Sequence, residues 1–382
     1  MGIHPADSEN PKAGIKIKNK KRITKKKKAT VPGDFVAGPH YKMKDIELSW
    51  LSKHRSPLMG FAMLIIVMFH VCGMRHETLW LCLARCGNVG VDMFLFLSGI
   101  GLWFAWSKRP GFRHFYLRRY RRIYPAWLIV AAIYYIPKCI DGKIDIGYTI
   151  LELLVNWGYW ERQELNFWFI PTILAFYAVA PLYMRLIQRH TQYRWLPIAF
   201  MLLSLLINYW LPLRQCLGYL EIMFSRIPIF LLGINMGEAV KSNRKIEGST
   251  IWLLLIIFAM SLFACVNFED GLRHRFPLFI ERWAYIPLSV TMMLLLSWLF
   301  EHTPKLFLRS LAFIGTISLE LYLIHVEFVL KNIKPYHLGY WPTLLSVLAI
   351  SVTLAWILNK TVEKLTSFNI NKRPPSPDNF VA

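Results

Sequence analysis

Long apolar blocks recur along most of the chain, each about 18 to 22 residues in length, with short polar segments between them. Blocks of this length match the ~20 residues that an α-helix needs to cross the ~30 Å hydrocarbon core of a bilayer. The pattern predicts an all-α fold, a polytopic bundle of about ten transmembrane helices. A further apolar stretch, 146–160, is too short to span and predicts a re-entrant or an interfacial helix on the outer side. The predicted spans are 57–76, 87–106, 123–140, 166–187, 195–212, 222–240, 250–267, 284–300, 311–332 and 340–359.

The polar segments divide the chain into three parts. Residues 1–46 form a basic tail that we expect to be disordered, because its run KIKNKKRITKKKK is too charged to pack and at most contacts anionic lipid headgroups. Residues 47–360 form the transmembrane domain, and residues 361–382 form a second tail. The first apolar block is long enough to remain as a span and is not a signal peptide. Met43 is an alternative translation start.

Composition and charge exclude several classes of protein. With 55% apolar residues, 18% charged residues and a mean hydropathy of +0.36, the chain is not a soluble enzyme, a disordered protein or a small disulfide scaffold. Of its 45 Lys and Arg, 33 lie in the N-terminal tail and alternate loops, and 11 in the intervening loops. Because positive loops remain in the cytoplasm, we expect both termini on that side of a cytoplasmic (inner) membrane. The net charge of +22 thus reflects topology, and we expect no nucleic-acid partner.

The predicted topology puts all six cysteines at outer span ends or in outer loops, where an oxidising compartment permits disulfides. Six cysteines allow 15 pairings, and small buried apolar side chains are the alternative interpretation. The chain has no CxxC pair, and the span histidines have no cysteine or second carboxylate at ligand spacing, so we predict no metal site. The cysteines are Cys72, Cys82, Cys86, Cys139, Cys216 and Cys265.

Two ionisable residues, His70 and Asp92, lie at similar depth in the first two spans. Consecutive spans joined by a short loop are usually neighbours, so we expect these side chains to meet. A carboxylate beside an imidazole orients the ring and raises its basicity, which is what a general base needs. A hydrogen bond between helices with no chemical role is the alternative for each residue.

Other ionisable residues within spans are also candidates, because burial of such groups in a membrane is costly. Arg226, near the outer end of span six, either extends its guanidinium outward to water or stabilises a developing oxyanion. Span nine carries Glu320, His325 and Glu327, and we expect both glutamates to face the bundle interior.

A cluster of basic residues lies at the opposite mouth of the bundle, before span three. Within it, Arg119, Arg122 and Pro125 form the pattern RxxRxxP. The two arginines are three residues apart and share a helix face, so they form a candidate phosphate clamp. Topological anchoring is the alternative, and it is our interpretation of Arg118 and Arg121.

The sequence thus predicts an anion site at the cytoplasmic mouth of the bundle and a base in its outer half. This arrangement suits an enzyme that transfers a group from a phosphorylated donor in the cytoplasm to an acceptor outside. A proton-coupled secondary transporter or flippase for a surface-glycan precursor, with His70, Asp92 and Glu320 as a proton relay, is the main alternative. The absence of an internal repeat weighs against it. A receptor or scaffold with purely structural buried charges is the third possibility.

Six motifs follow one another along the chain: RSPLMGFAMLIIVMFH ending at His70, GVDMFLFLSG with Asp92 and Ser98, RRYRRIYP, FWFI followed by Tyr177 and Pro181, RIPIFLLG and ISLELYLIH. Each is a loose apolar pattern, but six in this order make the chain resemble the acyltransferase 3 family, integral membrane enzymes that O-acylate cell-surface carbohydrates. The resemblance covers about residues 47–360. One departure is Met59, where the family often has an arginine; Arg55, one turn earlier, or Arg226 is the candidate replacement.

The resemblance implies a transmembrane acyltransferase domain with acyl-CoA, usually acetyl-CoA, as co-substrate and no bound cofactor. It implies that the phosphates lie near Arg119 and Arg122 and that His70 deprotonates an acceptor hydroxyl while Asp92 holds its ring. The acceptor is expected to be a surface polysaccharide or lipid-linked glycan. Direct transfer and an acyl-enzyme both remain open, as do the acyl group, the acceptor sugar and the oligomeric state. Further residues expected in the acceptor pocket or in transition-state support are Trp168, Arg226, Glu320, Tyr322 and His325.

Overall fold

The computed structural model is almost entirely helical in the part of the chain that it describes. The one short sheet in that part pairs β1 (Ile46–Glu47) with β2 (Lys245–Ile246) in antiparallel register. The residues described are 44–73, 78–211, 213–270, 272 and 275–371.

Eight helical segments of the described chain are long and apolar enough to cross a membrane. A ninth is a pair of helices that bend by 59° where α15 (Lys305–Thr316) meets α16 (Ser318–Ile324). After α16 the chain continues through a π-helical turn (His325–Leu330) into α17 (Lys331–Ile333). The eight are α2 (Arg55–Cys72), α3 with α4 (Leu79–Arg85 and Val89–Lys108), α5 (Phe112–Ile140), α8 (Phe169–Arg189), α10 to α12 (Leu213–Leu217, Glu221–Phe224 and Ile227–Lys241), α13 (Ile251–Asp270), α14 (Leu278–Phe300) and α18 (Tyr340–Asn371).

The remaining predicted span, 195–212, corresponds to α9 (Leu196–Trp210), which has only 15 residues. The segments before and after α9 nevertheless reach opposite ends of the bundle. Before α9, Gln188 accepts a hydrogen bond from Trp106 at the end of α4. After α9, the backbone N–H of Tyr219 bonds to Gln163, which precedes α8. The chain therefore returns along the length of α8 through a helix shorter than a full span.

Contacts between loops agree with the predicted alternation. At the end where α2 begins, β1 pairs with β2, Lys53 binds Glu301 at 2.6 Å, and Lys241 donates to Ser107 at 3.3 Å. These segments belong to the loops rich in Lys and Arg. At the other end, α6 (Ile146–Val155) and α7 (Trp157–Glu161) lie in the apolar stretch expected outside the spans. The short helix α1 (Ser49–Lys53) directly precedes α2, at the end where α2 begins.

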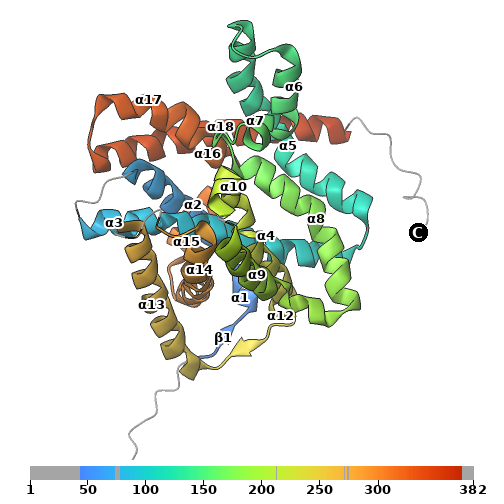
Figure 1. The fold of residues 1–382 in the computed structure, drawn as a ribbon, viewed down its shortest axis with the longest axis vertical. Coiled ribbons are helices and arrows are strands. Elements are labelled where there is room, and N and C mark those ends of the chain that lie inside the picture. Colours follow the sequence, from blue (N-terminus) through green and yellow to red (C-terminus); the bar gives the residue numbers. More distant parts are fainter. Residues whose placement is uncertain (1–43, 74–77, 212, 271, 273–274, 372–382) are drawn as a thin grey trace, which may run out of the picture. The chain divides into compact units, whose positions relative to one another are not determined.

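The centre of the bundle is built on α2 and α4 (Figure 1). α2 packs closely against both α4 and α15. A Cβ atom on Gly60 would collide with the carbonyl group of Leu311, and one on Gly315 with that of Ser56. Glycine at these two positions lets the backbones of α2 and α15 touch, as small residues do between membrane helices.

We predict that Gly60→Ser destabilises the protein by about 1–3 kcal/mol, the usual cost of overpacking a filled core. Thermal denaturation in detergent measures the effect as a lower Tm. Gly111→Ser is the matched control, because a Cβ at Gly111 meets no atom within 4 Å and its backbone is extended at the start of α5. Equal Tm values for the two variants would contradict the close helix contact.

Candidate active site

Two cavities in the helical bundle meet at a shared wall. The first, which we call the Arg55 cavity, has about 830 Å³ of space between its atoms, including the open solvent at its mouth, and is lined by Arg55 and Arg122, among others. The second, the Arg282 cavity, has about 1910 Å³ of space, again including open solvent, and Arg226 and Arg282 are in its lining. The residues that line both cavities are Ile66, His70, Val91 and Trp168.

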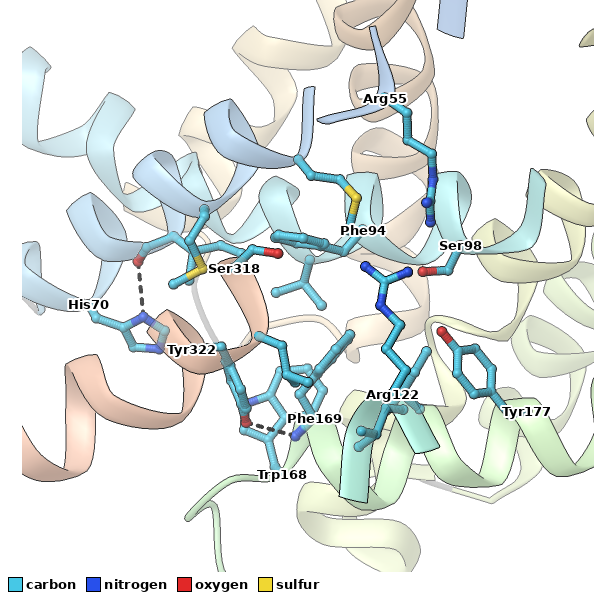
Figure 2. A pocket seen from close by; sticks show the side chains of 17 residues that line it. Arg55, His70, Phe94, Ser98, Arg122, Trp168, Phe169, Tyr177, Ser318 and Tyr322 are labelled. Carbon is cyan, nitrogen blue, oxygen red and sulfur yellow. Dashed lines mark hydrogen bonds between the residues drawn. The ribbon is translucent and has the colours of Figure 1, made fainter. Parts of the chain in front are cut away.

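The Arg55 cavity is polar at one end and apolar along its length. Arg55, Ser98, Arg122 and Tyr177 gather at the polar end, and Figure 2 shows His70 at the far end. His70 follows Arg55 by 15 residues on α2, which corresponds to about 22 Å of helix. Arg122 is exposed and Arg55 is half-buried, so the polar end opens to solvent. The apolar lining includes Met59, Met63, Phe94, Phe169 and Ile173.

Only one arginine of the expected RxxR clamp lines this cavity. Arg122 lines it, but Arg119 donates from Nη2 to the carbonyl oxygen of Gly101 at 3.3 Å and lies over the ring of Phe115. Arg55 supplies the second guanidinium, one turn of α2 before Met59. The structure thus brings together Arg55 and Arg122, with Arg119 outside the lining.

His70 presents one free ring nitrogen at the shared wall. Its Nδ1 lies 2.9 Å from the carbonyl oxygen of Ile66, one turn earlier on α2, and 3.2 Å from Nε2 of His325. A carbonyl oxygen can only accept a hydrogen bond, so in the neutral ring Nδ1 carries the hydrogen and Nε2 keeps its lone pair. Among the described residues, Nε2 has no hydrogen-bond partner. The ring can therefore accept a proton at Nε2.

Asp92 does not meet His70, so the predicted contact between them is wrong. The carboxylate of Asp92 is completely buried between two arginines, with Oδ2 2.7 Å from Nη1 of Arg282 and Oδ1 3.3 Å from Nε of Arg226. Matched depth along two helices does not fix the direction in which a side chain points, and here two opposite charges attract the carboxylate more strongly than imidazole does. His325 takes the position beside His70 instead.

Arg226 is almost fully buried and belongs to the wall of the Arg282 cavity. Besides Asp92, it binds Oδ1 of Asn88 at 2.6 Å and lies 5.1 Å from the ring centroid of Trp168. These contacts hold the guanidinium inside the bundle, so the first of the two alternatives for Arg226, extension outward to water, is wrong.

Of the span-nine residues expected to support the site, Tyr322 lines a cavity, whereas Glu320 and His325 do not. Tyr322 lines the Arg55 cavity and accepts a hydrogen bond from the backbone N–H of Phe169 at 3.0 Å. Glu320 is buried, accepts a hydrogen bond from Asn359 on α18 and lines neither cavity. His325 is fully buried behind His70 and also lies outside both linings.

Many of the side chains that line the Arg282 cavity can form hydrogen bonds. Glu327 faces it from the π-helical turn and pairs with Lys331 at 2.6 Å, and aromatic rings complete the wall. In the part of the chain that the structure describes, no group of three or more His, Cys, Asp or Glu residues could hold a metal ion. Polar residues of the lining include Asn88, Gln163, Asn166, Glu221, Glu269 and Glu281, and the aromatic ones are Phe69, Trp168, Tyr219 and Phe276.

Sequence reasoning missed Arg282 as a site residue. The predicted span eight began at residue 284, which assigned Arg282 to a loop, whereas α14 begins at Leu278 and carries this arginine into the bundle. Its guanidinium is 1% exposed, so its pairing with Asp92 is shielded from water. The signal available in the sequence was an arginine two residues before a predicted span, in a chain that carries a carboxylate, Asp92, within an earlier span.

Comparison with known proteins gives one match. A family model described as an acyltransferase domain, that of the acyltransferase 3 family, matches residues 58–360. The match runs from α2 into α18 and includes His70, Asp92, Arg226 and Arg282, while Arg55 lies three residues before it. No curated protein and no solved structure matches the chain.

We predict that Asp92→Asn lowers the stability by about 3–5 kcal/mol, because it leaves two buried guanidiniums without a compensating charge. The expected result is a clear loss of Tm in thermal denaturation. Asp141→Asn is the matched control. The carboxylate of Asp141 lies 2.9 Å from Lys143, a distance similar to that between Asp92 and Arg282, but the pair is exposed. This control should stay within about 0.5 kcal/mol of the wild type. A decrease in Tm no greater than that of the control would show that the buried arginines do not need the charge of Asp92 for the stability of the protein.

Proposed function

The chain belongs to the acyltransferase 3 family, and we propose that it is a membrane O-acyltransferase in which His70 is the general base. In this proposal the acyl group, acetyl in the first instance, passes from cytoplasmic acyl-CoA to a hydroxyl group of an extracytoplasmic carbohydrate. The observation that carries the proposal is the position of His70, whose ring belongs to the walls of both cavities.

The Arg55 cavity suits the donor. Acyl-CoA has a phosphorylated end and a long thin arm that ends in the thioester. The guanidiniums of Arg55 and Arg122 at the open end can bind phosphate through charge-assisted hydrogen bonds. The arm would then extend about 22 Å along α2, between apolar side chains, to His70. The loops at this end carry most of the Lys and Arg, so we place it in the cytoplasm.

The Arg282 cavity suits a carbohydrate acceptor. Its amide and carboxylate side chains can hydrogen-bond several hydroxyl groups, and its aromatic rings can pack against the C–H faces of a sugar. The cavity reaches His70 from the side opposite to the donor. An acceptor hydroxyl and a thioester carbonyl can therefore meet at His70 without sharing one opening.

The reaction needs one proton acceptor between the two substrates. Nε2 of His70 takes the proton of the acceptor hydroxyl, and the hydroxyl oxygen attacks the thioester carbonyl carbon. The C–O bond forms, the C–S bond breaks, and the departing sulfur takes the proton back from Nε2. The products are an ester and free CoA, and His70 returns to its neutral form. The guanidiniums of Arg226 and Arg282 lie in the wall of the Arg282 cavity, on the acceptor side, where they can stabilise the oxyanion.

We predict that His70→Ala lowers acyl transfer by about 10²–10⁴-fold, the usual contribution of a general base. Mass spectrometry of the envelope glycans of expressing cells measures the product. His302→Ala is the matched control, because Nδ1 of His302 also contacts the carbonyl oxygen four residues earlier, at 3.1 Å, but the ring is exposed at the other end of the bundle. Wild-type acylation by the folded His70→Ala protein would refute the assignment of the base.

Loss of either cavity arginine should weaken donor binding. Because a hydrogen bond to a charged group contributes about 1.5–3 kcal/mol, Arg55→Ala or Arg122→Ala should raise the KM for acyl-CoA by roughly 10–100-fold. Initial rates in everted membrane vesicles measure this change. Arg118→Ala removes an exposed arginine from the same helix as Arg122 and should leave KM unchanged. Equal KM values for the Arg118 and Arg122 variants would exclude Arg122 from the donor site.

A further inference from the structure

Among the residues that the structure describes, the ring of His70 is supported by a second histidine and not by a carboxylate. The rings of His70 and His325 meet edge-to-face with centroids 5.0 Å apart, and Nε2 of His325 lies 3.2 Å from Nδ1 of His70. His325 is fully buried, so this contact is shielded from water. The one carboxylate expected near His70, that of Asp92, is occupied by two arginines.

The main chain fixes the hydrogen positions of both rings. Nδ1 of His325 lies 3.0 Å from the carbonyl oxygen of Leu321 and 2.9 Å from that of Tyr322. Because both carbonyls can only accept, Nδ1 of neutral His325 carries the hydrogen, and its Nε2 offers a lone pair. That lone pair faces Nδ1 of His70, whose hydrogen is shared between His325 and the carbonyl of Ile66. The four contacts agree on one arrangement of hydrogens.

We propose that His325 is a positioning residue for His70, a role that rests on the proposed function above. Its Nε2 holds the ring of His70 in the tautomer that leaves Nε2 of His70 basic. When that atom takes the proton of the acceptor, Nδ1–H of His70 remains a donor, and Nε2 of His325 together with the Ile66 carbonyl stabilises the positive ring. His325 contacts neither substrate, because it lies outside the lining of both cavities.

An uncharged hydrogen-bond acceptor for His70 suits the buried position of His325. A carboxylate at the position of His325 would be a buried negative charge with only neutral groups around it whenever His70 is neutral, which is costly in an apolar interior. The imidazole needs no counter-ion, and two carbonyls already satisfy its own N–H. The π-helical turn begins at His325, directly after α16, and such turns often occur at functional sites.

Two amide substitutions separate the proposed role from a purely structural one. The side-chain oxygen of glutamine can occupy the place of Nε2 of His325 and accept from His70, so His325→Gln should keep part of the activity. The shorter asparagine reaches only the place of Nδ1, where its NH₂ can still bind the carbonyls of Leu321 and Tyr322. His325→Asn therefore keeps the hydrogen bonds to the two carbonyls but loses the contact with His70. His325→Leu loses both.

The experiment measures transfer of labelled acetyl from acetyl-CoA in everted vesicles from cells that make both the protein and its acceptor glycan. We expect His325→Leu and His325→Asn to lower kcat by about 10²-fold, within the range of a lost general-base contribution, with the KM for acetyl-CoA unchanged. His325→Gln should recover roughly a tenth or more of the wild-type kcat. In a His70→Ala background, His325→Leu should cause no further loss.

Several results would overturn the proposal while leaving His70 as the base. These are wild-type kcat in folded His325→Leu, higher activity of the Asn variant than of the Gln variant, or an effect of His325→Leu that adds in full to His70→Ala. Absence of transfer by the wild type would instead refute the proposed function. If the variants do not fold, histidine ¹⁵N NMR of the wild type decides, with the His70 signal assigned by its loss in His70→Ala. The hydrogen of His70 must be on Nδ1, and a hydrogen on Nε2 excludes the proposal.

Discussion

The site depends on the close approach of α2 to the helix pair α15–α16. Gly60 and Gly315 let the two backbones touch, so main-chain contact and not flexible side chains sets the distance between the helices. Ten residues further along each chain segment, His70 meets His325. The same α2 begins with Arg55, so one helix connects the polar end of the Arg55 cavity with the ring of His70 at its other end.

The distribution of charge separates the two halves of the bundle. In the half around the Arg282 cavity, buried ions are compensated: Asp92 lies between Arg226 and Arg282, and Arg85 pairs with Glu269 at 3.6 Å. This pairing keeps the energetic cost of burial low. Between that half and the polar end of the Arg55 cavity lie mainly apolar side chains. In the proposed reaction, the open arginines attract the negatively charged end of the donor, and its uncharged arm enters the apolar part.

The sequence predicted the helical bundle well because the length of an apolar block directly reflects membrane thickness. It failed at α9, whose helix is shorter than its apolar block, and at Arg282, which it placed in a loop. It identified His70 but paired it with Asp92, because depth along a helix is readable from residue number whereas the direction of a side chain is not. Span helices are apolar on nearly every face, so periodicity gives little indication of which face turns inward. The direction of His325 emerged only from the packing of α16 against α2.

The central claim is that donor and acceptor meet at His70 from two separate cavities. A structure of the protein with a non-transferable acetyl-CoA analogue, in which a methylene group replaces the thioester sulfur, tests it most directly. Our account predicts phosphate groups between Arg55 and Arg122, an arm that follows α2, and the analogue's carbonyl group beside Nε2 of His70. An analogue whose acyl end lies away from the wall shared by the two cavities would contradict it.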